Sequence, residues 1–166
     1  MYLKNISVRN VISMEKVVPH RDNLYKTFSD WGSEFRIEFS FKYIKYSQVW
    51  LNLFHFTTGE NLGGPGNRIP ALFIMRSGEI NMWSDIDGVN GYRIYLGTYP
   101  MNLWHDVVIE QRNSIFRVWI NDSEKFVKDN PTAPNTIYEI VHLYLSDPWH
   151  PSFGSYGEMA NFKVSY

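Results

Sequence analysis

The clearest pattern in the chain is a strict alternation of apolar and polar residues in "EFRIEFSFKYIK", residues 34 to 45. The apolar set occupies every second position from Phe35 to Tyr43, and the positions between are charged or polar. A period of two places one set on one face of a strand, and no helix could bury that set on one side. The pattern predicts a half-buried β-strand.

The next segment, "QVWLNLFHFT" at residues 48 to 57, is apolar on both faces, as expected for a strand covered on two sides. Further strand candidates are "RIPALFIM", "EINMWS", "YRIYLG", "LWHDVVIEQ", "IFRVWIN", "SEKFVK", "IYEIVHLYLS" and "GEMANFKVSY". Turn-forming clusters of Gly, Pro, Asn and Asp separate them, and no segment of ten residues has an amphipathic helical period. About ten short strands with turns between them predict a β-sandwich or barrel.

The N-terminal part of the chain is patterned least. The segment "VVPHRDNLYKTFSD" has neither a strand nor a helix period. We expect one domain over residues 1–166, with its core in residues 34–166. Residues 1–33 are expected to supply an N-terminal strand and a segment that wraps a sheet edge.

Composition agrees with an all-β fold and narrows the partners. Of the 166 residues, 44% are apolar and 20% charged, and an aromatic content of 17% favours strands. The net charge of -1 gives no electrostatic reason to expect nucleic acid as a partner. No apolar run approaches the ~20 residues of a membrane-spanning helix, so no membrane insertion is expected. The absence of cysteine excludes disulfides, zinc–thiolate sites and cysteine catalysis.

Three motifs in register resemble the laminin G-like domain family. They are the hairpin "NRIPALFIMRSGEINMWSDIDG", the Trp-His segment "YPMNLWHDVVIEQRNSIFRVWIND", and the close "HLYLSDPWHPSFGSYGEMANFKV". The resemblance covers residues 34–166 and implies an antiparallel two-sheet β-sandwich, a jelly roll of the concanavalin A-like group. The chain departs from the family pattern at Glu158, where a family cysteine would fall, and at Asn67, where many members have a calcium-binding Asp.

The resemblance also implies a calcium site at one rim of the sandwich. Calcium prefers carboxylate and carbonyl oxygens, and the candidate ligands are Asn67, Asp85, Asp87 and Asn90. With Asn67 in place of the family's Asp, the site would have one charge fewer and bind weakly. In the alternative interpretation, Asp85 and Asp87 only form Asx turns in "SDIDG".

Two kinds of chemistry fit the sequence poorly. The loop "GGPGNR" lacks the Lys and the following helix of a phosphate-binding loop, and Pro65 removes a backbone donor. The related fold group includes family 16 glycoside hydrolases, which carry Glu-x-Asp-x-x-Glu on one strand. Here "EINMWS" offers Glu79, but Asn81 and Ser84 replace the other two acids, so the paired carboxylates of a glycosidase are missing. We therefore expect no enzymatic activity.

Two rim loops, residues 61–68 and residues 146–156, are the best candidates for ligand binding, because function in sandwiches tends to sit on loops. The loop "SDPWHPSFGSY" is stiffened by two prolines and carries aromatic side chains suited to a sugar ring or a protein hot spot. In the alternative interpretation, Trp149 only covers an open end of a sheet. The candidate ligand-binding residues of the two loops are Asn61, Asn67, Arg68, Asp147, Trp149, His150 and Tyr156.

These observations favour a non-catalytic recognition module that binds a glycan or an extracellular protein through its rim loops. We expect it outside the cell or at the cell surface. Two alternatives stay open. One is a structural block that self-associates as a homo-oligomer through a sheet face or edge, since the chain has more aromatic residues than one core obviously needs. The other is a degenerate glycoside hydrolase.

Overall fold

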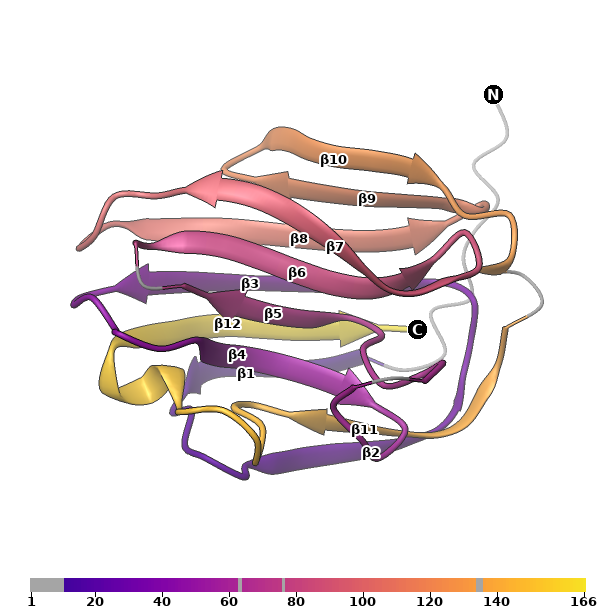
Figure 1. Cartoon of the computed structure of the whole chain (residues 1–166), viewed down its shortest axis with the longest axis horizontal. Coiled ribbons are helices and arrows are strands. Elements are labelled where there is room, and N and C mark those ends of the chain that lie inside the picture. Colours follow the sequence, from indigo (N-terminus) through magenta and orange to yellow (C-terminus); the bar gives the residue numbers. More distant parts are fainter. Residues whose placement is uncertain (1–10, 63, 76, 134–135) are drawn as a thin grey trace.

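The computed structural model describes residues 11–62, 64–75, 77–133 and 136–166. These residues form two six-stranded sheets, and every pair of neighbouring strands is antiparallel (Figure 1). The predicted all-β, two-sheet sandwich is confirmed. Within these ranges there is no helix with the length and apolar character needed to cross a membrane.

The first sheet has the strand order β1-β12-β3-β8-β9-β10. Its strands are β1 (Val11–Val17), β12 (Gly157–Ser165), β3 (Phe35–Tyr43), β8 (Trp104–Arg112), β9 (Ile115–Ile120) and β10 (Ser123–Asp129). The alternation of β3 sets its burial: all five apolar side chains between Phe35 and Tyr43 are at most 9% exposed. This confirms the half-buried strand that the sequence predicts.

The second sheet has the strand order β2-β11-β4-β5-β6-β7. Its strands are β2 (Leu24–Trp31), β11 (Tyr138–Tyr144), β4 (Leu51–Thr57), β5 (Ala71–Ile74), β6 (Glu79–Ile86) and β7 (Val89–Thr98). A short 3-10 helix, η2 (Phe153–Ser155), lies in the connection between β11 and β12.

Strand β4 is covered on both faces, as its sequence predicts. All seven of its residues are buried. On the core side, the ring of Phe54 lies 5.4 Å from that of Phe39 in the opposite sheet, with an edge-to-face geometry. On the other side, His55 is covered by two loops, one after β4 and one after β11. These two loops, together with the face of the sheet that they cover, form the candidate site.

The N-terminal part differs from the sequence-based expectation in one respect. Residues 24–31 form the full strand β2 instead of an irregular wrap, although β2 does lie at the edge of its sheet. Among the residues of this strand whose burial the structure describes, Phe28 and Trp31 are the two that are fully buried. These two residues are three positions apart, so their spacing does not show the period of two of a strand. For this reason the apolar pattern did not predict β2.

Candidate functional site

One row of side chains crosses the second sheet from β11 to β7. Tyr144 of β11 is paired with His55 of β4, and His55 with Ala71 of β5. Ala71 is paired in turn with Trp83 of β6, and Trp83 with Arg93 of β7. Residues paired directly in antiparallel strands project from the same side of a sheet. The row therefore lies on the side away from the core, which we call the outer face of the second sheet.

Three aromatic rings form the floor of this outer face. Phe73 of β5 lies 5.2 Å from Trp83, ring centre to ring centre, and Trp50, just before β4, lies 5.4 Å from Trp83. Trp50 and Phe73 are 6.2 Å apart. All three pairs have edge-to-face geometry, which aromatic rings favour. Phe73 is buried, whereas Trp50 and Trp83 are partly exposed and can contact a ligand.

Arg68, on the loop after β4, lies over this floor. Its guanidinium carbon is 5.0 Å from the ring centre of Trp83 and 5.3 Å from that of Phe73, within range of a cation–π interaction. One terminal nitrogen donates a hydrogen bond to Oδ1 of Asn61 at 3.0 Å. Burial lowers the pKa of Arg68 from its usual value, and the nearby Asp147 carboxylate opposes that shift.

Arg93 lies over the same floor from the side of β7. Its guanidinium carbon is 5.5 Å from the ring centre of Trp83 and 5.9 Å from that of Trp50. Nε of Arg93 donates to Oδ1 of Asn81 at 3.1 Å. Two positive side chains thus converge on one aromatic surface from two different elements.

Two adjoining clefts open on this surface and share Arg68 and Trp83. The larger, of about 260 Å³, lies between the loop after β4 and the start of β7. The smaller, of about 130 Å³, is lined by Trp50, Arg68, Phe73, Trp83 and His150. Together they are lined by aromatic rings, the guanidinium group of Arg68 and the imidazole of His150.

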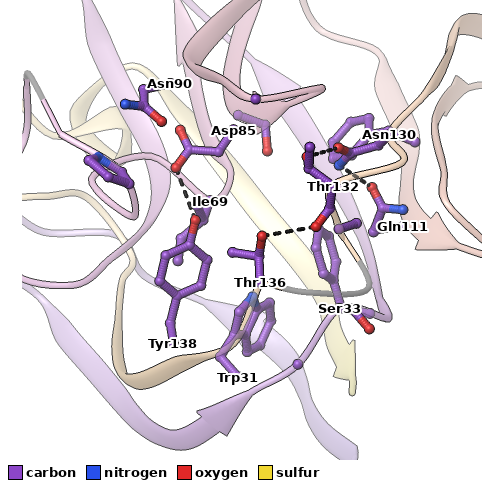
Figure 2. A pocket seen from close by; sticks show the side chains of 17 residues that line it. Trp31, Ser33, Ile69, Asp85, Asn90, Gln111, Asn130, Thr132, Thr136 and Tyr138 are labelled. Atoms are coloured by element: carbon purple, nitrogen blue, oxygen red, sulfur yellow. Dashed lines mark hydrogen bonds between the residues drawn. The ribbon is translucent and has the colours of Figure 1, made fainter.

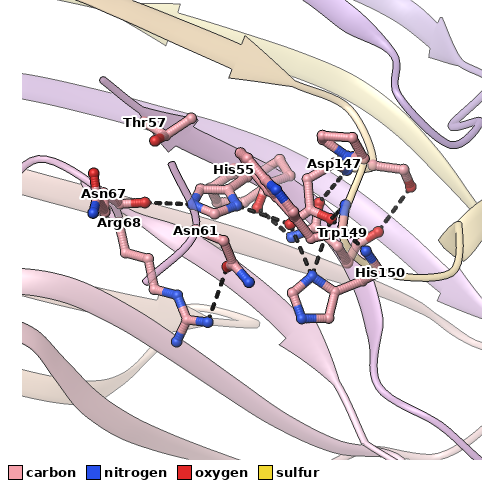
Figure 3. A network of polar contacts seen from close by, with 12 residues as sticks. His55, Thr57, Asn61, Asn67, Arg68, Asp147, Trp149 and His150 are labelled. Carbon is pink, nitrogen blue, oxygen red and sulfur yellow. Dashed lines mark hydrogen bonds and ion pairs between the residues drawn. The ribbon is translucent and has the colours of Figure 1, made fainter. Parts of the chain in front are cut away.

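A buried histidine–aspartate pair supports the clefts from below (Figure 3). Nδ1 of His55 lies 2.8 Å from Oδ2 of Asp147, and Nε2 of His55 lies 2.6 Å from the backbone carbonyl oxygen of Asn67. Both oxygens are acceptors, so the ring donates to both only when each nitrogen carries a proton. His55 therefore joins the two loops that flank the clefts.

Asp147 also organises its own loop (Figure 3). Its Oδ1 accepts hydrogen bonds from the backbone N–H groups of Trp149 and His150, at 3.1 and 2.9 Å, and Nδ1 of His150 lies 3.0 Å from both carboxylate oxygens. Burial alone would raise the pKa of Asp147. The hydrogen bonds from His150 and His55 outweigh burial and hold the pKa of this carboxyl far below its usual range. The carboxylate thereby fixes His150 at the smaller cleft.

Asp85 anchors the other flanking loop (Figure 2). Its carboxylate accepts hydrogen bonds from the backbone N–H of Gly66 at 2.6 Å, from that of Gly91 at 2.8 Å, and from the hydroxyl of Tyr138 at 3.1 Å. Gly66 has φ +83°, and a Cβ there would meet Thr58 Cγ2 at 2.6 Å. Only glycine fits this position, which sets the path of the loop that carries Arg68.

Another cleft, of about 160 Å³, opens at the end of the sandwich and is lined by Asp85 and Asn90 among other residues (Figure 2). Of the other residues proposed to bind calcium, Asn67 is buried and its amide donates to the carbonyl of Leu62. Asp87 lies 3.3 Å from Nζ of Lys128. Among the described residues, no group of three or more His, Cys, Asp or Glu side chains could hold a metal ion. Calcium binding at this rim stays a prediction.

The calcium hypothesis has a direct test. If calcium binds at this rim, millimolar CaCl₂ raises the unfolding temperature relative to EDTA, because a ligand that binds only the folded state stabilises it. Asp87→Asn and Asn90→Ala should then abolish the rise, whereas Asp122→Asn, in the exposed turn that precedes β10, should keep it. Equal unfolding temperatures in both buffers would exclude the site.

The structure separates the predicted ligand-binding residues into two groups. Asn61, Asn67 and Arg68 line the larger cleft, and Arg68 and His150 the smaller. The remaining three, Asp147, Trp149 and Tyr156, line neither cleft.

Each of these three has another place. Asp147 is fully buried, so it positions the loop and is not exposed for ligand. Trp149 is 39% exposed and packs 5.4 Å from His55. The ring of Tyr156 lies 4.8 Å from Nζ of Lys45 instead.

Sequence reasoning missed four residues of the site: Trp50, Phe73, Trp83 and Arg93. Three of them lie on strands, and their side of the sheet depends on cross-strand register. The one usable signal was a strand pattern with Trp83 among polar neighbours in "EINMWS". A tryptophan on the polar side of a strand is a candidate for ligand contact.

The chain is similar in structure to several solved proteins. The Ruminococcus gnavus IT-sialidase CBM40 bound to α2,3-sialyllactose superimposes with a TM-score of 0.59 at 13% identity, over 93% of this chain and 91% of that one. A heptameric SAP-like pentraxin from Limulus polyphemus gives a TM-score of 0.57 at 12% identity, over 96% and 77%. Domain 4 of AbnA, a GH43 extracellular arabinanase from Geobacillus stearothermophilus, in complex with arabinotriose, gives a TM-score of 0.53 at 15% identity. That superposition covers 83% of this chain and 62% of that one.

No protein-family model matches the sequence, and no curated protein does. At these identities the structural likeness establishes the fold alone. The chain is an antiparallel two-sheet β-sandwich, and the outer face of its second sheet carries an aromatic surface with Arg68 and Arg93 over it.

Proposed function

We propose that this chain is a non-catalytic carbohydrate-binding module whose ligand lies on the outer face of the second sheet. The observation that carries the proposal is the partly exposed Trp50–Trp83 surface flanked by Arg68, Arg93 and His150. Rigid aromatic rings with hydrogen-bond donors at their edges match a sugar ring, which has an apolar face and polar edges. The proposal retains the expected location outside the cell.

The site is held in place before a ligand arrives. Asp147 and Asp85 each fix one flanking loop through several hydrogen bonds. Their partners include backbone N–H groups, so the loop paths are set as well as the side chains. A preorganised site loses little conformational entropy on binding. This supports recognition by the clefts as they stand.

Structural neighbours support the proposal at a coarse level. One is a sialidase CBM40 bound to a sialylated sugar, and another is an arabinanase domain in complex with arabinotriose. Their sequences are too different for their ligands to be transferred. For a non-catalytic role, the supporting observation is that the clefts are lined by aromatic, amide and cationic side chains, without the facing carboxylates of a glycosidase among the described lining residues.

The test is a glycan-array screen followed by titration calorimetry with the best ligand. Trp83→Ala should weaken that binding by about 10-fold or more, because a central aromatic contact contributes over 1 kcal/mol. The matched control is Trp104→Ala, which removes a tryptophan that is 46% exposed on β8 of the other sheet.

Binding that survives Trp83→Ala and is lost in Trp104→Ala would move the site to the first sheet. A folded protein that binds no glycan would favour the alternative of a self-associating block. Light scattering at high concentration then checks that alternative, and a monodisperse monomer would exclude it.

A further inference from the structure

Over the described ranges, the two arginines of the outer face lack the ion pairs that other arginines of the molecule make. Neither Arg68 nor Arg93 forms an ion pair with a carboxylate among the residues that the structure describes. Their side-chain oxygen partners are the neutral amides of Asn61 and Asn81. Elsewhere in the molecule Arg36 pairs with two carboxylates, Glu38 and Glu110, at 2.9 and 3.1 Å. The two positive charges of the site are not compensated in this way.

Arg68 in particular is poorly solvated. Its Nε is buried and has no hydrogen-bond partner within the described part of the chain. The aromatic rings of Phe73 and Trp83 lie against its guanidinium and remove water from that side. A buried donor without a partner is costly, and the cost is larger on a charged group. A ligand oxyanion near this guanidinium would compensate that charge and could supply the missing acceptor.

The carboxylate of Asp147 does not compensate the positive charge of Arg68. Asp147 influences its pKa through space but makes no ion pair with it. Both oxygens of Asp147 are engaged by His55, His150 and the backbone of its loop. This carboxylate is fully buried and cannot swing out to meet Arg68.

We infer that the saccharide bound by this site carries an oxyanion, a carboxylate or a sulfate ester, which Arg68 and Arg93 contact while Trp83 packs against the sugar ring. The inference deepens the proposed function and rests on it. A guanidinium presents a planar fork of donors that fits such an oxyanion. Both arginines lie over the Trp83 ring, at 5.0 and 5.5 Å, so their positive charges converge on one part of the outer face.

The experiment measures affinity by calorimetry for pairs of probes that are matched except for the charged group. Tri-galacturonic acid is compared with its methyl ester, 3′-sialyllactose with its methyl ester, and 6-O-sulfated galactose with galactose. At least one acidic probe should bind about 10-fold or more tightly than its neutral match, as hydrogen bonds to charged groups imply. The carboxylate and sulfate arms distinguish the two sources of negative charge. Binding of the acidic probe should weaken as salt rises.

Arg68→Gln and Arg93→Gln should each weaken binding of the acidic probe more than binding of its neutral match, and so remove most of the preference for the acidic probe. Arg93 is exposed, so its substitution leaves the fold intact even if that of Arg68 does not. The matched control is Arg117→Gln on β9 of the other sheet, which should preserve the preference.

The outcomes separate this inference from the proposed function. Equal binding of acidic and neutral probes, lost in Trp83→Ala, would retain carbohydrate binding and overturn the acidic ligand. A preference unchanged in both arginine variants would also overturn it. No binding of any probe or of any glycan on the array would overturn both.

Discussion

We expect Asp147→Ala to lower the free energy of unfolding by about 3–5 kcal/mol, because it removes a buried carboxylate and leaves several hydrogen-bond donors without their acceptor. Asp147 is fully buried, and its carboxylate holds His55, His150 and the N–H of Trp149. Without it, the ring of His55 faces a cavity on one side and keeps only the carbonyl of Asn67 on the other. The variant should also bind glycan more weakly, because His150 loses its anchor.

The same carboxylate predicts how stability depends on pH. Its pKa in the folded protein lies far below its usual range, so the folded state holds the group ionised where the unfolded state, with a pKa of about 3.9, takes up a proton. The contribution of Asp147 is therefore complete above the unfolded value. It is lost progressively as pH falls from about 5 towards the folded pKa.

Urea unfolding at a series of pH values measures both effects. The difference in unfolding free energy between the wild type and Asp147→Asn should shrink as pH falls through this window. The other carboxyl groups are present in both proteins, so their contribution cancels in this difference. Asp129→Ala, at the exposed end of β10, is the control and should change stability by about 0.5 kcal/mol at most. A difference independent of pH would contradict the assignment of the ionised carboxylate.

The second large effect is expected for Trp31→Ala, which should cost about 3–5 kcal/mol. Trp31 is 1% exposed, and its ring centre lies 4.8 Å from that of Phe56 in its own sheet and 5.2 Å from that of Phe35 in the other. It also stacks on Tyr166 at 5.4 Å. Removal of the indole leaves a cavity where the two sheets meet, and rings held by their own strands can fill it only in part.

The measurement is again urea unfolding. The slope of the unfolding free energy against urea concentration is expected to be the same in the variant and the wild type. Trp31→Phe keeps part of the aromatic contact and should lose less than alanine does. Trp104→Ala, which removes an exposed tryptophan, should stay within about 0.5 kcal/mol of the wild type. If Trp31→Ala were as stable as Trp104→Ala, the contacts of Trp31 with Phe35 and Phe56 could not be a large contribution to stability.

Much of the fold could be predicted from local pattern. The alternation in β3 predicts both a strand and the face that it buries, because side-chain direction in a strand follows directly from position. Strand β4 was predicted to be covered on both sides, and it is. Strand β2 was not predicted, since it is an edge strand whose buried residues Phe28 and Trp31 are three positions apart and give little periodic signal.

The candidate site was predictable only in its loops. Arg68 and His150 could be selected because polar and aromatic residues between turn formers mark a rim loop. Asp147 was selected as a ligand contact, yet it is buried, because its partner His55 is 92 residues away in the sequence. No local pattern shows that a carboxylate will meet a histidine so distant in the chain.

The sequence by itself determined most of the strands other than β2, the faces of them that are apolar, and the loops that carry polar and aromatic side chains. Tertiary structure decided which strands are neighbours and in what register. That register places Trp83 opposite Arg93, and the packing of a distant loop brings Arg68 over the same ring. The physical reason is that strand order and register follow from the packing of the whole core and from turn geometry, and they are not encoded in any one strand. A site spread over several strands exists only after the sheet has formed.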